Sequence, residues 1–541
     1  MHAALGFILV AGPHRTHVRA CIAQALCCDA MARFSLEQVT QERRCAGHFD
    51  GLKPVQSDRI RRAAERSASN PPIDRTNRTN DARLHLAGAG LPRQQQCVHR
   101  HRPDHDMTDP TGAIRMDTVS ETVKRAAFDT SIKVDGRRLW DSLMEVAKIG
   151  ATPKGGVCRL ALTDLDKAGR DLIVGWAKAA GCTVTVDTMG NVFMRRAGRV
   201  ADAAPVITGS HADSQPTGGR FDGIYGVLGG LEVIRSLNDY GIETEHPVEV
   251  VIWTNEEGSR FAPAMVASGV FAGVFSLEYG LSRKDVDGKT IGEELARIGY
   301  AGDVPCGGRQ LHAAFELHIE QGPILEAECK TIGVVTDAQG QRWYEITFTG
   351  QEAHAGPTPM PRRRDALLGA SRVVDLVNRI GLDHAPFGCA TVGMMQIHPN
   401  SRNVIPGRVF FTVDFRHPDD AVLAKMDAAL RDGVARIAGE IGLETALEQI
   451  FYYKPVAFDP ACVAAVRDAA DRFGYSHRDI VSGAGHDACY LAQVAPTSMV
   501  FVPCVDGISH NEIEDATPAW IEAGANVLLH AMLSRACEPA S

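Results

Sequence analysis

Short apolar strands that end in polar loops, with helical segments between them, constrain the fold of this chain most strongly. Residues 205–208, 248–253 and 315–319 are predicted strands, and the polar sequences GSHADS, NEEG and EQG follow them closely. The periodicity predicts a helix over 224–240. This alternation predicts an α/β fold, a mostly parallel sheet with helices on both faces. Functional groups collect at the carboxyl ends of strands in such sheets, so these loops predict the site.

The pattern changes in the middle of the chain. Residues 343–348 alternate as a half-exposed strand, and strands are also predicted over 391–397 and 408–415. Amphipathic helices are predicted over 365–380 and 421–442. This β-α-β-β-α order predicts a separate small α+β unit that is inserted into the larger one.

The beginning of the chain differs in charge from the rest. Residues 1–106 carry 16 Lys+Arg and 10 Asp+Glu, a net charge of +6, whereas the remainder carries −15. A basic arm that binds nucleic acid is one interpretation. We favour an unfolded or upstream extension, with Met107 or Met116 as the working initiator, because periodicity is almost absent there. The predicted organisation is an N-terminal extension (1–117), a catalytic domain in two parts (118–332 and 454–541) and an inserted lid or dimerisation domain (333–453).

Composition excludes several classes of protein. The 541 residues are 45% hydrophobic and 23% charged, which is typical of globular domains, and no apolar run is long enough for a transmembrane helix. The 14 Cys show no CxxC pattern, so we expect neither a cysteine metal site nor a disulfide framework. We therefore expect a cytoplasmic protein with no membrane and no nucleic-acid partner.

Histidines and carboxylates recur just after the predicted strands. Neutral imidazoles and carboxylates are common ligands of Zn²⁺ and Mn²⁺. Any one of these histidines is more often a structural, hydrogen-bonded residue, but the set as a whole favours a metal site. The candidate ligands are His211, Asp222, Glu257, His318 and His510.

Glu256 and Glu257 are adjacent, which poses a geometric problem. Neighbouring residues on a regular strand point to opposite faces, so both can serve one site only if the strand has ended. Gly258 permits such a break. One carboxylate could then bind metal while the other accepts a proton from the attacking water. The alternative is a solvated acidic turn.

The polar motifs also occur in a characteristic order between Val134 and Trp520. They are GSHADSQPTGGRFDGIYGVLGGLEV, NEEGSRF, ELHIEQGP, GQEAHAGPTPM, SRNVIPG, VDFRH, SGAGHDA and ISHNEIE. This set resembles the metal-dependent amidohydrolases of the M20-type aminoacylase superfamily. Within it, the chain is similar to the N-carbamoyl-amino-acid amidohydrolase group, which includes β-ureidopropionase (β-alanine synthase) and allantoate amidohydrolase.

The resemblance implies a role for each candidate residue. Glu256 would be the general base, and Asp213 would orient a liganding imidazole. His354 would stabilise the oxyanion from the neighbouring subunit; by itself it could equally be a turn residue. The implied metal ligands are His211, Asp222 and His318 for one ion and Asp222, Glu257 and His510 for the other; the implied substrate-binding residues are Gln321, Asn403 and Arg416.

Arg416 would clamp the substrate carboxylate through a bidentate pair, although an arginine on a strand could also be an exposed charge or a salt-bridge partner. The resemblance further implies two divalent metal ions, Zn²⁺ first, with Mn²⁺, Co²⁺ or Ni²⁺ as alternatives. It also implies a homodimer through the inserted domain. Gly333 and residues 452–456 are candidate hinges.

The implied activity is metal-dependent hydrolysis of the ureido C–N bond. The substrate would be a small-molecule ureido acid, N-carbamoyl-β-alanine or an N-carbamoyl-L-amino acid, and the products the amino acid, NH₃ and CO₂. The sequences GATPKGGVCRLALTDLDK and GCTVTVDTMGNVF resemble this branch more than the allantoate branch. The alternative is an allantoate amidohydrolase or, more remotely, an M20-type aminopeptidase or a non-catalytic metal-binding homologue.

Overall fold

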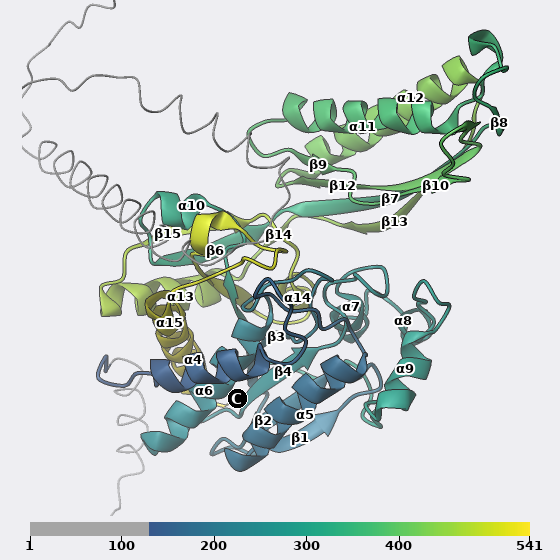
Figure 1. Cartoon of the computed structure of the whole chain (residues 1–541). Helices are drawn as coiled ribbons and strands as arrows, with labels where there is room; N and C mark the ends of the chain where they lie inside the picture. The colour runs from purple at the N-terminus through teal and green to yellow at the C-terminus, as the bar shows by residue number, and fades with distance from the viewer. Residues whose placement is uncertain (1–128, 541) are drawn as a thin grey trace, which may run out of the picture. The chain divides into compact units, whose positions relative to one another are not determined.

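Two β-sheets, one of nine strands and one of five, organise residues 129–540, the part of the chain that the computed structural model describes (Figure 1). These residues belong to the unit Pro110–Ser541. The predicted N-terminal extension (1–117), with both interpretations of its charge, lies outside the described residues.

The nine-stranded sheet has the order β1-β2-β4-β3-β5-β16-β6-β14, and β15 also pairs with β6. The strands β4, β3, β5 and β16 run parallel to one another at its centre. Antiparallel pairs flank this centre on both sides. The strands are β1 (Thr183–Val186), β2 (Val192–Arg196), β3 (Val206–His211), β4 (Val248–Trp253), β5 (Ala313–Ile319), β6 (Ile332–Ala338), β14 (Val456–Ala457), β15 (His477–Ser482) and β16 (Thr497–Val502).

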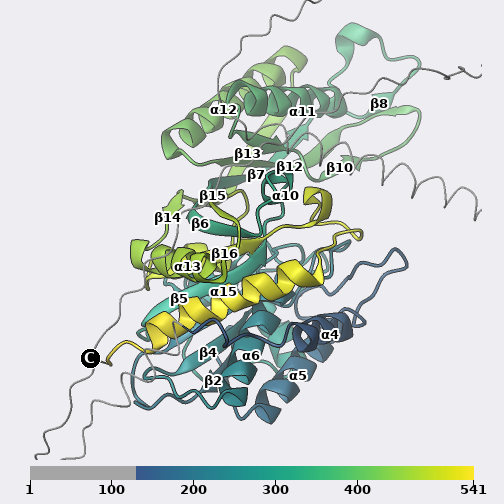
Figure 2. The same cartoon turned by 90° about the vertical axis from the view of Figure 1, so that its left-hand side faces the viewer.

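Helices cover both faces of this sheet. Every residue of β3, β4, β5 and β16 is buried, as expected for central strands between two helical layers. Helices α6, α13 and α15 pack on one face, where α15 lies along β5 and β16 (Figure 2). Helices α7 and α14 lie on the other face, where Phe271 and Leu491 join a cluster with Ile207 and Val251. The helices of this part are α4 (Gly136–Val146), α5 (Asp164–Ala179), α6 (Ile224–Asp239), α7 (Val266–Phe271), α8 (Leu277–Leu281), α9 (Ile291–Ile298), α10 (Ile324–Ala327), α13 (Pro460–Phe473), α14 (Asp487–Leu491) and α15 (Pro518–Ala536), with a 3₁₀ turn η2 (Val505–Gly507).

The predicted α/β class is confirmed, and the sheet is more mixed than predicted. Its parallel centre follows from the strand–helix alternation, whereas the antiparallel edge at β1 and β2 comes from a hairpin. That hairpin turns at Met189-Gly190, where Gly190 has φ +78°.

The five-stranded sheet is antiparallel throughout, in the order β10-β12-β7-β13 with β9 also on β12. A separate two-stranded pair joins β8 to β11. The elements are β7 (Gly340–Thr349), β8 (Ala353–His354), η1 (Met360–Arg362), α11 (Ala366–Asp383), β9 (Cys389–Thr391), β10 (Met395–His398), β11 (Val404–Ile405), β12 (Arg408–His417), α12 (Asp420–Ile441) and β13 (Glu444–Tyr453).

Helices α11 and α12 cover one face of this sheet (Figures 1 and 2). Along β12, buried Val409, Phe411, Val413 and Phe415 point toward the helices and form the core with residues of β7. The intervening residues of β12 therefore lie on the opposite face. That face carries the side chains that this sheet contributes to the site described below.

The chain passes between the two sheets at Gln339 and again between Tyr453 and Val456. Strand β6 still pairs in the nine-stranded sheet, so the first crossing falls at Gln339 rather than at the predicted boundary of 333. Gly333 pairs with β15 and β16 on its two sides, which makes it part of the sheet and not a hinge. The second crossing falls within the predicted hinge segment 452–456.

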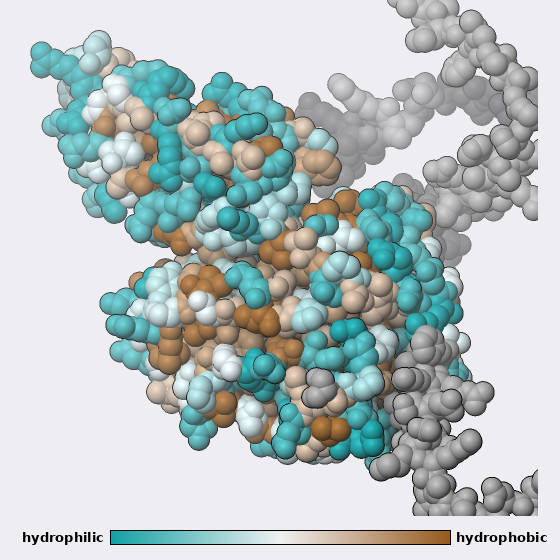
Figure 3. Space-filling model, turned by 180° about the vertical axis from the view of Figure 1, so that it is seen from behind, coloured by the Kyte–Doolittle hydropathy of each residue, from teal (hydrophilic) through white to brown (hydrophobic). Residues whose placement is uncertain are grey.

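Within residues 129–540, none of the helices combines the length and apolar character needed to span a bilayer. The face seen in Figure 3 mixes hydrophilic and apolar residues.

Candidate active site

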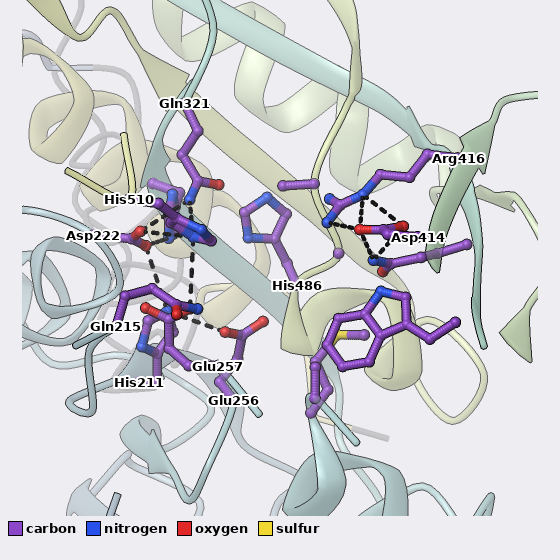
Figure 4. A pocket seen from close by; sticks show the side chains of 17 residues that line it. His211, Gln215, Asp222, Glu256, Glu257, Gln321, Asp414, Arg416, His486 and His510 are labelled. Carbon is purple, nitrogen blue, oxygen red and sulfur yellow. Dashed lines mark hydrogen bonds and ion pairs between the residues drawn. The ribbon is translucent and has the colours of Figure 1, made fainter. Parts of the chain in front are cut away.

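One cavity of about 220 Å³ collects polar groups from both sheets (Figure 4). The ends of β3 and β5 and the loop after β4 contribute one side, and β7 and β12 contribute the other. Most of the site residues predicted from the sequence line this cavity: His211, Asp222, Glu256, Glu257, His318, Gln321, Arg416 and His510.

Asp222 lies at the centre of the imidazole–carboxylate cluster. Its Oδ1 atom is 3.2 Å from His318 Nε2 and 3.6 Å from His211 Nε2. Its Oδ2 atom is 3.3 Å from His510 Nε2, which is also 3.5 Å from Glu257 Oε2. The two oxygens of Asp222 thus face different partners. This is the arrangement of a carboxylate shared between two sites.

Two groups of three side chains could each hold a metal ion. They are His211, Asp222 and His318, and Asp222, Glu257 and His510. Within each group one ligand atom per residue lies within 4.8 Å of the others. These are the two ligand sets that the family resemblance implies, and all of these residues except His510 are buried.

The tautomers of the buried imidazoles fit a metal site. His211 Nδ1 is 2.9 Å from the carbonyl oxygen of Asp213, and His318 Nδ1 is 2.9 Å from that of Ile319. A carbonyl oxygen only accepts, so each Nδ1 carries a proton and each Nε2 faces the carboxylate of Asp222 at 3.2–3.6 Å. Either a proton on Nε2 or a cation between the imidazole and the carboxylate satisfies this contact, and an Nε2 atom that loses its proton presents a lone pair to the cation. A divalent ion satisfies this donor set.

The pKa values of the side chains in this cluster reflect two opposing effects, burial and the charges of neighbouring groups. Burial opposes the charged form of His318, but the hydrogen bond to Asp222 and its charge outweigh burial and raise the pKa to about 9. The same balance raises the pKa of His510 to about 9. Burial dominates at His211 and lowers its pKa to about 4. Burial and the charge of Asp222 raise the pKa of Glu257 to about 8. The cluster therefore favours bound positive charge.

A break in the backbone after β4 brings both adjacent glutamates to the cavity. The strand ends at Trp253, and Asn255 and Gly258 have φ values of +58° and +66°. Non-glycine residues rarely adopt positive φ, and such conformations concentrate at functional sites. As a result Glu256 Oε2 lies 3.4 Å from His211 Nε2, while Glu257 belongs to the second ligand group. Burial, reinforced by the charges of nearby carboxylates, raises the pKa of Glu256 well above its usual value.

The carboxylate of Asp213 fixes the backbone at Glu256 and Glu257 and makes no contact with an imidazole among the described residues. Its Oδ1 and Oδ2 atoms accept hydrogen bonds from the backbone N–H groups of Glu256 (3.4 Å) and Glu257 (3.3 Å). The contact to His211 Nδ1 comes from the Asp213 backbone carbonyl. Asp213 therefore contacts the imidazole of His211, as the resemblance implies, but through its backbone carbonyl and not through its carboxylate. The local turn brings the carbonyl under the ring and turns the side chain toward β4.

Gly223 and Glu514 position Asp222 from its two sides. Gly223 has φ +68°, and a Cβ there would lie 2.3 Å from the His211 ring. Glu514 Oε1 accepts from the backbone N–H groups of Phe221 (3.0 Å) and Asp222 (3.1 Å). The sequence alone predicts no role for Glu514, although this residue lies in the ISHNEIE motif. Gln215, which donates to Glu257 Oε2 at 2.6 Å, was also missed.

The five-stranded sheet contributes a basic group to the cavity. Arg416 donates from Nε and Nη2 to Asp414 (3.1 and 2.8 Å to Oδ2) and from Nη1 to the carbonyl oxygen of Gly483 (3.2 Å). Gln341 Nε2 donates to the same carboxylate at 3.1 Å. Arg416, Asp414 and Gln341 share the face opposite the helices. The predicted carboxylate clamp, Arg416, therefore has an acidic partner, Asp414, that was not predicted from the sequence.

Gln321, with φ +58°, directs its amide nitrogen to Asp222 Oδ2 at 3.0 Å. Two other predicted residues are not brought into the cavity. His354 is exposed on β8, and Asn403 precedes β11; the two strands pair, with His354 opposite Val404. Asn403 also accepts a backbone bond from Ala355 at 2.9 Å. His354 and Asn403 thus lie together, outside the cavity of their own chain.

The fold and this cluster agree with the comparisons to known proteins. The chain belongs to Peptidase family M20/M25/M40, whose profile matches residues 207–534, and it is a hydrolase of that family. The family expected from the motifs is therefore confirmed.

Three relatives illustrate this membership. The chain is 54% identical over 411 residues to the N-carbamoyl-L-amino-acid amidohydrolase of Rhizobium meliloti, and this match covers 76% of this chain and 99% of the relative. An amidase of the hydantoinase/carbamoylase family from Burkholderia vietnamiensis, whose crystal structure is known, is 96% identical in sequence to this chain. The two structures superpose with a TM-score of 0.76, and the match covers 76% of this chain and 100% of that chain. The ureidoglycolate hydrolase of Arabidopsis thaliana is 32% identical over 410 residues, 74% of this chain and 86% of the relative.

Proposed function

We propose that this protein hydrolyses the ureido C–N bond of N-carbamoyl-L-amino acids or N-carbamoyl-β-alanine. The observation that carries the proposal is that one cavity holds both the imidazole–carboxylate cluster and the guanidinium of Arg416. Such a cavity suits a substrate with a hydrolysable carbonyl at one end and a carboxylate at the other. The name of the Rhizobium meliloti relative supports the same substrate class.

Two divalent ions would be held by the two groups that share Asp222, with Zn²⁺ as the first candidate and Mn²⁺, Co²⁺ or Ni²⁺ as alternatives. When bound, they would supply Lewis-acid polarisation of the carbonyl and lower the pKa of water. The raised pKa values of His318 and His510 support this assignment, because both imidazoles hold a proton where a cation would otherwise lie.

Glu256 is the general base in this mechanism. It lies in the cavity beside His211 but outside both ligand groups, so its carboxylate is left for proton transfer. Glu256 removes a proton from water as the water oxygen bonds to the ureido carbon. It then donates that proton to the nitrogen of the amino acid as the C–N bond breaks. The products are the amino acid and carbamic acid, which decomposes to NH₃ and CO₂.

Arg416 binds the substrate carboxylate. Asp414 occupies the Nε side of its guanidinium and fixes the plane of the group, which leaves one N–H on each terminal nitrogen. Those two donors match the two oxygens of a carboxylate. Gln321 has a buried Oε1 atom without a protein partner among the described residues, and this oxygen can accept from the carbamoyl NH₂ group.

His354 and Asn403 complete the site from a second copy of the chain in this proposal. Both lie at the β8–β11 pair of the inserted unit and do not line the cavity of their own chain, and His354 is exposed. A homodimer would bring them to the partner's cluster, where the imidazole of His354 would stabilise the developing oxyanion.

The test is ammonia release from a substrate panel, with and without a chelator. The panel contains N-carbamoyl-L-amino acids, N-carbamoyl-β-alanine, allantoate and ureidoglycolate. We expect chelator-sensitive turnover of the first two. Exclusive turnover of allantoate would instead support the allantoate amidohydrolase alternative, and exclusive turnover of ureidoglycolate would support the activity named for the Arabidopsis thaliana relative. No turnover of any member by metal-loaded protein would refute the proposal.

A further inference from the structure

The two sequences that resemble the carbamoyl-amino-acid branch, residues 150–167 and 181–193, have no role in the mechanism proposed above. The first runs into α5 and the second contains the turn between β1 and β2, and α5 contacts β1 (Figure 1). Neither segment lines the cavity. Side chains from α5 and from this turn meet instead at Thr254, the residue that directly follows β4 and begins the backbone break before Glu256.

Arg170 of α5 is a buried cation with a fixed set of partners. Its Nε atom donates to both carboxylate oxygens of Asp166 at 3.0 Å, and both side chains are fully buried. Its Nη1 atom donates to the carbonyl oxygen of Gly190 at 3.0 Å and to the hydroxyl oxygen of Thr254 at 3.1 Å. A buried ion pair adds little net stability, because the loss of hydration offsets the attraction between the charges. The directed contacts of this guanidinium therefore point to a role in geometry.

Thr254 is held by its backbone as well as by its hydroxyl group. Its N–H donates to Asn191 Oδ1 at 3.0 Å. Asn191 is fixed in turn, because its Nδ2 atom donates to Asp187 Oδ2 at 2.8 Å. The side chains of Thr254, Asn191 and Asp187 are all buried. The residue at which the chain leaves β4 is thus anchored from α5 and from the β1–β2 turn.

The loop that follows Thr254 depends on this anchor. Asn255 has φ +58°, a conformation that non-glycine residues rarely adopt. Beyond it, the backbone N–H groups of Glu256 and Glu257 donate to the carboxylate of Asp213 at 3.4 and 3.3 Å. These distances exceed the usual N–H···O range of about 2.7–3.2 Å, so the contacts with Asp213 are weak. The shorter contacts at Thr254 therefore set the direction of the loop.

We propose that Arg170 is a positioning residue, which turns the carboxylate of Glu256 toward the cavity through its hydrogen bond to the Thr254 hydroxyl group. This inference rests on the proposed function, in which Glu256 is the general base. Arg170 does not line the cavity, so it acts only through Thr254 and the loop. The same loop carries Glu257. One ligand group therefore depends on Arg170, whereas the group of His211, Asp222 and His318 contains no residue of the loop.

Thr254→Val and Thr254→Ser separate the hydroxyl contact from the packing of this side chain. Valine keeps the shape and removes the hydroxyl group, whereas serine keeps the hydroxyl group and removes the methyl group. For Thr254→Val with saturating Zn²⁺ and an N-carbamoyl-L-amino acid, we expect kcat to fall about ten- to hundredfold, because a misplaced catalytic group costs this much. KM should stay within about twofold, because Arg416 lies on β12 of the other sheet. Thr254→Ser should restore most of kcat.

Thr208→Val is the matched control. Thr208 and Thr254 are both 1% exposed, and Thr208 lies on β3, the strand that pairs with β4. Its hydroxyl oxygen has no hydrogen-bond partner within residues 129–540. We expect Thr208→Val to keep wild-type kcat. A loss at Thr208→Val as large as at Thr254→Val would overturn the inference, and so would full activity of Thr254→Val.

A Zn²⁺ titration of the metal-free protein tests the loop without substrate. We expect Thr254→Val to weaken the binding of one ion by about tenfold or more and to leave the other unchanged, because only Glu257 moves with the loop. Equal weakening of both ions would show general loosening and would overturn the inference, as would unchanged binding of both. A wild type that hydrolyses no N-carbamoyl amino acid would refute the proposed function, and the role of Glu256 with it. The titration would still decide whether the loop depends on Thr254.

A double-mutant cycle assigns the effect to Arg170. Arg170→Met is combined with Asp166→Asn, because removal of one partner alone leaves the other charge buried and unpaired. Asparagine keeps an acceptor for the backbone N–H of Leu162, which donates to Asp166 Oδ2 at 2.8 Å. In this background we expect kcat to be as low as in Thr254→Val, and the further change Thr254→Val to alter it by less than about twofold. A further loss as large as that in the wild type would show that the hydroxyl group acts without Arg170, which would overturn the inference.

Discussion

Replacement of Glu514 by alanine is expected to destabilise the fold and the metal centre together. Its Oε1 atom accepts from two buried backbone N–H groups, those of Phe221 and Asp222, and its Oε2 atom accepts from Ser509 Oγ at 2.7 Å. Alanine leaves both amides without an acceptor, at about 1–3 kcal/mol each. The expected loss is therefore about 2–6 kcal/mol in the free energy of unfolding. Because Asp222 belongs to both ligand groups, metal occupancy should fall as well.

The assay is urea unfolding of Glu514→Ala, together with metal content by mass spectrometry. Glu514→Gln keeps a carbonyl oxygen for the amides, so it should lose about 1 kcal/mol. Glu440→Ala is the control, because Glu440 makes exposed ion pairs with Arg436 and Arg372, and it should cost about 0–1 kcal/mol. If Glu514→Ala unfolds at the wild-type urea concentration with full metal content, Glu514 does not position Asp222 and the reasoning is refuted.

Three further predictions follow from the site. Glu256→Gln should keep its metal ions but lose about 10²–10⁴-fold in kcat, and near-normal turnover of a metal-loaded variant would reject Glu256 as the base. Gly223→Ala should lower metal occupancy, because its Cβ would collide with the His211 ring and its φ is +68°; wild-type metal content would contradict this. Metal binding at pH 7 should release protons, because the pKa values of His318 and His510 are raised to about 9 in the metal-free protein. Calorimetry in buffers of different ionisation enthalpy measures this proton release, and its absence at pH 7 would contradict the assignment. The raised pKa values of His318 and His510 also stabilise the metal-free fold; this contribution is fully present below pH 6.5 and is lost as the pH rises through about 9.

The central strands and the ligands at their ends could be predicted because each is encoded locally. Strand β4 matches the predicted range 248–253, and β5 extends the prediction by two residues at its start. Short apolar runs that end in polar loops carry this information directly. The predicted ligand side chains follow those runs, and the fold brings them together at one edge of the sheet.

Helices and strands whose apolar residues show no clear periodicity were not predicted. Helix α15 is buried on nearly all sides, so its apolar residues show no amphipathic pattern. Strand β13 was not predicted because most of its residues are exposed or half-exposed and show no regular alternation of apolar and polar residues. Without β13, the inserted unit was expected to have one strand fewer on its β7 edge.

Side chains that act through distant partners were also beyond the sequence. Glu514 lies 292 residues from Asp222, and no local pattern marks the hydrogen bond between them. Asp414 is two residues from Arg416, but that spacing alone does not distinguish an ion pair from two exposed charges. Likewise, only the structure shows that the buried Nε2 atom of His486 lacks a hydrogen-bond partner among the described residues.

The central claim is that the two groups sharing Asp222 bind a pair of divalent ions. Anomalous diffraction at the zinc edge from crystals of the zinc-loaded protein tests it directly. We predict two anomalous peaks per chain, one bounded by His211, Asp222 and His318 and the other by Asp222, Glu257 and His510. A single peak, or peaks at other side chains, would contradict the account.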